Sequence, residues 1–152
     1  MEKRNVLFVM SSLRNGGAER SLVNLLQLLD YNRYNVDLLL FQNEGMFLKQ
    51  VPKAVNIISN CNKLYTLYDN NKAEALKHPY LSAVHMIGTF ISRKKTNSVA
   101  KSRQYRWEHF YKKIVPELTK EYDVAIAYMQ REQTYFLVDK VKAAKKITWV
   151  HN

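Results

Sequence analysis

Cysteine, proline and glycine are scarce in this 152-residue sequence, which contains one, three and four of them. The single cysteine, Cys61, cannot form an intrachain disulfide, so we expect a thiol in or near the core and a reducing cytoplasmic environment. No long apolar run is present. The first apolar run, Val6 to Met10, is too short for a signal segment or a membrane span. No repeat or low-complexity segment occurs, and 47% hydrophobic residues predict a globular fold with a real core.

Several familiar site motifs are also missing. The turn Gly16-Gly17-Ala18-Glu19-Arg20 has neither the spacing of a Walker P-loop nor that of a dinucleotide fingerprint. The histidines have no ligand spacing with Cys61 or a carboxylate, so no metal site is predicted, and Ser11 and Ser12 belong to no triad with them. No cofactor is expected.

Acidic residues are few, since 13 stand against 24 basic ones and give a net charge of +11. The window from Arg93 to Lys113 alone holds eight basic residues and one acid, a net +7. Such a run is usually a solvated face, but here aromatic residues alternate with the cations, which also suits an anionic membrane surface. Burial of Trp107 would favour core packing for its helix. The candidate surface residues are Lys94, Lys95, Arg103, Arg106, Lys112 and Lys113.

Apolar runs and helical stripes alternate along the chain. Strands are predicted at 6–10, 36–41, 55–59, 123–128 and 146–150, and helices at 18–29, 79–91 and 133–142. A further helix after a basic joint at 92–102 carries a stripe from Trp107 to Leu118, and 60–77 reads as a loop. This alternation predicts one α/β domain over 1–152, a Rossmann-like three-layer sandwich with a mostly parallel five-stranded sheet in the order 3-2-1-4-5.

The strand-to-helix turn at Gly16 and Gly17 is the first candidate site. A helix N-terminus attracts anions, and residues without a Cβ let a phosphate or a sugar ring approach the backbone. A tight turn without a ligand is the alternative interpretation. Ligands in parallel sheets bind beyond the carboxyl ends of the strands, which is also where His151 and Asn152 follow the last strand.

Three stretches resemble the family 4 glycosyltransferases of the GT-B fold. The first runs from Asn5 through Leu13 into Gly-Gly-Ala-Glu-Arg and a leucine-rich helix; the others are Glu121 to Tyr128 and Ile147 to Asn152. The specific parts are the Gly-Gly-Ala-Glu turn and the final histidine. Residues 60–105 match no part of that family.

The resemblance is to the N-terminal, acceptor-side domain of such an enzyme. It implies a retaining, metal-independent transfer from a nucleotide sugar to a polysaccharide or lipid-linked acceptor, at the cytoplasmic face of a membrane. His151 would contact the transferred sugar as the catalytic residue, and the cleft would be lined by Gly16, Gly17, Ala18, Glu19 and Asn152. The donor-binding domain and its acidic motif are absent from this chain, so we expect weak nucleotide binding or none, no turnover, and self-association of a truncated form.

Two other classes remain open at this stage. The net charge alone suggests a nucleic-acid binding module, although no recognisable RNA or DNA motif accompanies it. A receiver-like or flavodoxin-like single domain would also have five strands. That class should carry paired acids or a phosphate loop at the switch point, and residues Ser11 to Asn15 supply neither.

Overall fold

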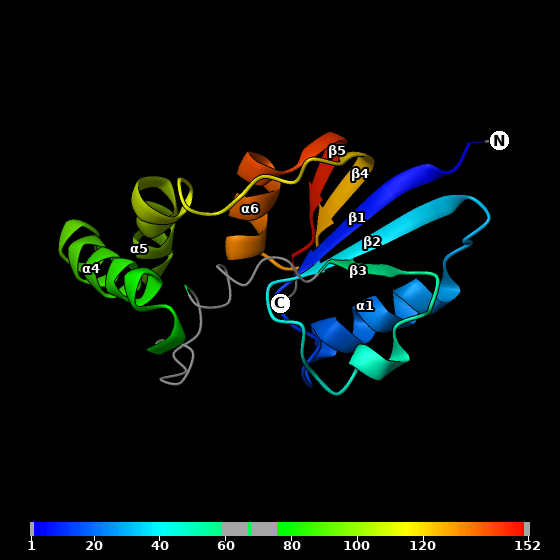
Figure 1. The fold of residues 1–152 in the computed structure, drawn as a ribbon, viewed down its shortest axis with the longest axis horizontal. Helices are drawn as coiled ribbons and strands as arrows, with labels where there is room; N and C mark the ends of the chain where they lie inside the picture. Colours follow the sequence, from blue (N-terminus) through cyan, green and yellow to red (C-terminus); the bar gives the residue numbers. More distant parts are fainter. Residues whose placement is uncertain (1, 59–66, 68–75, 151–152) are drawn as a thin grey trace. The chain divides into compact units, whose positions relative to one another are not determined.

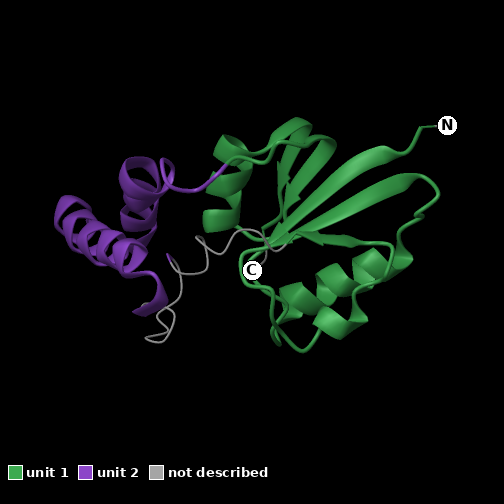
Figure 2. Cartoon of the chain, viewed as in Figure 1, with its two compact units in different colours: residues 1–60, 117–152 green, residues 61–116 purple. Residues whose placement is uncertain are grey.

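The computed structural model describes residues 2–58, Leu67 and residues 76–150. The chain forms two compact units, shown in different colours in Figure 2. The first unit, residues 1–60 and 117–152, contains the whole β-sheet. The second, residues 61–116, is helical in most of its described part.

The sheet of the first unit has five strands in the order β3-β2-β1-β4-β5, and all four pairings are parallel (Figure 1). This confirms the predicted α/β, Rossmann-like architecture. Val6 pairs with Val36 on one side and with Val124 on the other, so the strand order reverses between β1 and β4. The strands are β1 (Arg4–Met10), β2 (Tyr34–Leu40), β3 (Asn56–Ile58), β4 (Glu121–Ala127) and β5 (Lys142–Thr148).

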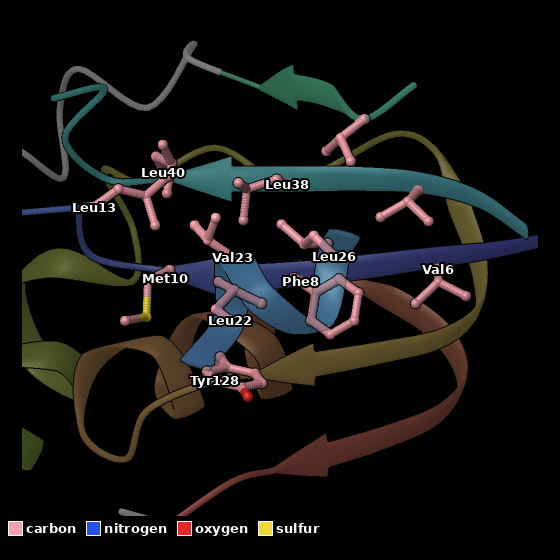
Figure 3. Close-up of a cluster of buried hydrophobic side chains, with 12 residues drawn as sticks. Val6, Phe8, Met10, Leu13, Leu22, Val23, Leu26, Leu38, Leu40 and Tyr128 are labelled. Carbon is pink, nitrogen blue, oxygen red and sulfur yellow. The ribbon is translucent and has the colours of Figure 1, made fainter. Parts of the chain in front are cut away.

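Helix α1 (Gly17–Leu28) covers one face of the sheet. Its inward stripe contains Leu22 and Leu26, which are fully buried, while Leu28 is exposed. Figure 3 shows this stripe against alternate residues of the two central strands, which is the period expected where one face of a strand meets a helix. The buried cluster consists of Val6, Phe8, Met10, Leu13, Leu22, Val23, Leu26, Val36, Leu38, Leu40, Val55 and Tyr128.

Helix α6 (Glu132–Lys140) contacts β1, β4 and β5. Its Phe136 is fully buried and meets the ring of Phe41 edge-on, with ring centroids 5.7 Å apart. A short 3-10 turn, η1 (Leu48–Gln50), precedes β3. The central strands are thus buried on both faces, which explains why they read as continuous apolar runs.

The second unit contains α4 (Pro79–Lys95), α5 (Val99–Arg106) and a π-helical turn η2 (Trp107–Tyr111). Pro79 begins α4 as predicted. The two helices are joined by a buried hydrogen bond between the hydroxyls of Ser92 and Ser102, 2.8 Å long. Gly88 lies against the ring of Phe110, so α4 and the π-turn approach closely. No helix among the described residues is long and apolar enough to cross a membrane.

Three predicted boundaries were wrong. The basic joint is only residues 96–98, because nothing between Ser92 and Lys95 breaks the helix. The following helix ends in the π-turn and does not reach Leu118, whose N–H instead donates to the carbonyl of Lys140 at 2.8 Å. The last strand begins at Lys142, four residues before its predicted start. Most of the predicted loop at 60–77 lies outside the described residues, while Leu67, Leu76 and Lys77 are helical.

Candidate functional site

The predicted glycine turn lies at the carboxyl end of β1, where α1 begins. Gly16 is the N-cap with extended backbone, and its carbonyl accepts the first helical bond from the N–H of Arg20 at 3.1 Å. No side chain caps the helix through a hydrogen bond. The carboxylate of Glu19 occupies the space that a Cβ on Gly16 would need, so the chain's own anion lies at the helix N-terminus.

Gly17 is exposed, and a Cβ added to it would meet no atom within 4 Å. Its φ lies outside the left-handed region. Neither packing nor backbone conformation therefore requires glycine here, and alanine would suit the first helical position better by up to about 1 kcal/mol. The missing side chain leaves open space in front of the helix N-terminus, as close approach of a ligand to the backbone would need.

A second loop holds the glycine turn in place. The N–H of Leu13 donates to the carbonyl of Glu44 at 2.9 Å, and the N–H of Phe47 donates to the carbonyl of Leu13 at 3.1 Å. Arg14 forms an ion pair with Glu44, and its guanidinium also donates to the side-chain oxygen of Gln42 at 3.2 Å. The loop after β2 thus fixes the loop after β1 through backbone and side-chain bonds.

Two aromatic residues lie next to this turn at the ends of β4 and β5. Tyr128 is buried, and its hydroxyl shares a 3.0 Å hydrogen bond with that of Ser21, one helical turn after Gly17. The ring of Trp149 stands 5.4 Å from that of Tyr128, and 48% of its surface is exposed. The fold therefore brings the end of β5 to the beginning of α1. Trp149 was not predicted as a site residue, although it directly follows β5.

The start of α6 completes this edge of the sheet. Arg131 has φ 92°, a conformation that only glycine adopts easily. The side-chain amide of Gln133, oriented by its hydrogen bonds, accepts from the N–H of Ser11 at 3.3 Å and donates to the carbonyl of Gln130 at 3.2 Å. These contacts link the loop after β4 to the loop after β1.

The other predicted site residues have separate outcomes. Ala18 and Glu19 are half-buried in the first turn of α1, whereas His151 and Asn152 lie outside the described residues. The predicted cationic residues all belong to the second unit. Lys94, Lys95, Lys112 and Lys113 are exposed there, while Arg103 and Arg106 are half-buried.

Two of the aromatic residues in this cationic window, Trp107 and Tyr111, are buried and do not face a lipid surface. Trp107 is 1% exposed and Tyr111 is fully buried. The burial of Trp107 favours core packing for its helix. The hydroxyl of Tyr111 lies 3.0 Å from Nδ1 of His85, which is also 2.7 Å from the carbonyl of Leu67. Burial, together with the charges of Arg106 and Arg93, lowers the pKa of His85 despite the bond to Leu67. His85 is thus a hydrogen-bonded structural residue.

A buried charge that was not predicted from the sequence lies toward the amino-terminal ends of the strands, opposite the glycine turn. Asp37 on β2 is 3% exposed and accepts hydrogen bonds from Tyr122 at 2.7 Å, Lys120 at 2.9 Å and Asn56 at 3.0 Å. Burial would raise the pKa of Asp37, but these bonds and the charge of Lys120 together hold it below the usual value. Burial and the neighbouring carboxylate raise the pKa of Tyr122. The sequence signal for this buried charge was an aspartate within the otherwise apolar run Val36 to Phe41.

A shallow cavity of about 570 Å³ lies at the same amino-terminal edge, lined by residues that include Asn5, Asp123 and Lys142. The Asp123 carboxylate accepts from the backbone N–H of Asn5 at 2.7 Å, so it serves strand pairing. Within 2–58, Leu67 and 76–150, no three His, Cys, Asp or Glu side chains gather closely enough to hold a metal ion.

Comparisons with protein families, with curated proteins and with solved structures found no match to this chain.

Proposed function

We propose that this chain is the acceptor-side domain of a retaining GT-B glycosyltransferase, which moves a sugar from a nucleotide-sugar donor to a glycan or lipid-linked acceptor. The observation that carries the proposal is the open space at Gly17. The fold does not need glycine there, yet the residue leaves the first helical position of α1 without a side chain at the switch point between β1 and β4. The type of reaction is inferred from the resemblance of the Gly-Gly-Ala-Glu turn to that family.

The geometry suits a phosphorylated sugar. The first amides of a helix have no intrahelical acceptor and carry a partial positive charge, so those at Gly17 and Ala18 favour an anionic oxygen. The half-exposed ring of Trp149 offers an apolar face on which a sugar ring can stack. Glu19 lies at the same helix end, and its negative charge opposes a phosphate unless the side chain moves. In the proposed enzyme, His151 would contact the transferred sugar and the donor would be held mainly by a second domain.

Titration of the ¹⁵N-labelled chain tests this proposal. UDP-glucose and GDP-mannose are the donor probes, and inorganic phosphate is the control for simple anion binding. We expect the amides of Gly16, Gly17 and Ala18 and the indole N–H of Trp149 to shift together at millimolar nucleotide sugar, with smaller shifts for phosphate. Equal shifts with phosphate, or shifts only at other residues, would contradict the proposal.

A further inference from the structure

Helix α4 of the second unit has an exposed apolar face. Its buried side is formed by Leu81, Gly88 and Ser92. The apolar residues on the other side are 54–71% exposed, and helical spacing places them on one face: Tyr80, Met86, Ile87 and Phe90. This exposed face points away from the helix's own packing partners.

The same face ends in positive charge. Arg93, Lys94 and Lys95 form the last turn of α4, all three are exposed, and the helix contains no acidic residue. The ammonium group of Lys94 lies 4.5 Å from the centre of the Phe90 ring, so cation and aromatic side chain are adjacent on one surface. An apolar face bordered by cations is the pattern of helices that lie in a membrane interface.

We propose that α4 docks the second unit onto an anionic lipid bilayer, with Met86, Ile87 and Phe90 entering the interface and the last-turn cations contacting lipid phosphates. Charge complementarity selects this partner. A second copy that docked through its own α4 would bring no acid to pair with the cations, and a nucleic acid would leave the apolar side chains uncovered. The buried rings of Trp107 and Tyr111 take no part, so the docking surface is α4 and not the whole cationic window.

Co-sedimentation with vesicles tests the surface. Phosphatidylcholine vesicles with and without phosphatidylserine are compared at low salt, and we expect binding to the anionic vesicles only. Lys94→Gln with Lys95→Gln should weaken binding by at least about tenfold, since each interfacial cation contributes about fivefold. The matched control removes two exposed cations from β5, Lys142→Gln with Lys145→Gln, and should retain binding.

An apolar pair of variants completes the design. Met86→Ser with Phe90→Ser should abolish sedimentation, whereas Leu28→Ser with Met46→Ser removes exposed apolar groups elsewhere and should not. Circular dichroism checks that all four variants fold. Absence of binding to anionic vesicles, equal losses in test and control variants, or tighter binding to a random oligonucleotide than to the vesicles would overturn the proposal. It is independent of the proposed function, because the vesicle test uses α4 and the ligand titration uses the glycine turn.

Discussion

Gly45 lies directly against the backbone of Leu13. Its φ is 129°, and a Cβ at this position would collide with the carbonyl group of Leu13. The loop after β2 therefore approaches the loop after β1 through a residue without a side chain. Because the loop after β1 carries the glycine turn, Gly45 positions the candidate site without lining it.

Replacing Gly45 with alanine should destabilise the first unit. Both the positive φ and the collision with Leu13 oppose a Cβ, so we expect a loss of about 1–3 kcal/mol in the free energy of unfolding. Urea denaturation followed by circular dichroism measures it. The matched variant is Gly17→Ala, which should be neutral or slightly stabilising; equal destabilisation by both would contradict the structural assignment of the two glycines.

Replacing Asp37 with asparagine should remove a pH-dependent part of the stability. The variant loses a buried carboxylate that accepts three hydrogen bonds, with an expected cost of about 2 kcal/mol near neutral pH. The folded-state pKa of Asp37 is below its usual 3.8, so its contribution is present above that pH and is lost as the pH falls through the folded-state pKa.

Urea denaturation of both proteins at pH 7 and at steps below pH 4 checks this sign. The stability difference between native chain and variant should shrink in the acidic range. A difference that stays constant with pH would show that the ionised form of Asp37 has no special role in the fold.

Replacing Arg131 with glycine should stabilise the chain. The φ of 92° is strained for arginine, and glycine adopts it without penalty, so a gain of about 1–2 kcal/mol is expected. Thermal unfolding measures the change. Arg131→Ala removes the same side chain but keeps the strain, so it should give no comparable gain; an equal gain from alanine would assign the effect to the side chain.

Replacing Trp149 with alanine should weaken nucleotide-sugar binding about fivefold, because stacking against an aromatic ring contributes on the order of 1 kcal/mol. Trp149→Phe keeps an aromatic face and should retain most of the affinity. NMR titration with UDP-glucose gives both values. Unchanged affinity in the alanine variant would remove Trp149 from the site.

The central strands and α1 could be predicted from the sequence because burial makes their patterns simple. Residues 6–10 are enclosed on both faces and read as a continuous apolar run, and α1 has one buried stripe. The edge strand β5 lacks this signal, since only Ala143 among its residues is even half-buried. The prediction instead followed the apolar residues Ile147, Trp149 and Val150, of which the last two lie beyond the paired strand.

The helices of the second unit were harder for a related reason. Burial in α4 depends on Leu81 and on two small residues, Gly88 and Ser92, that fit close to neighbouring side chains and carry no hydrophobic signal. The apolar residues that did give a signal, such as Ile87 and Phe90, are exposed. At the candidate site, the glycine turn could be found from its spacing, whereas Trp149 and Arg131 became visible only through a ring contact and a backbone angle.

The most direct test of the glycine turn as a ligand site is the affinity of Gly17→Ala for UDP-glucose and GDP-mannose beside that of the native chain. The added methyl group contacts nothing in the fold, so the variant should keep its stability while its millimolar binding falls at least tenfold. Unchanged affinity for both nucleotide sugars in a stably folded Gly17→Ala chain would contradict the account.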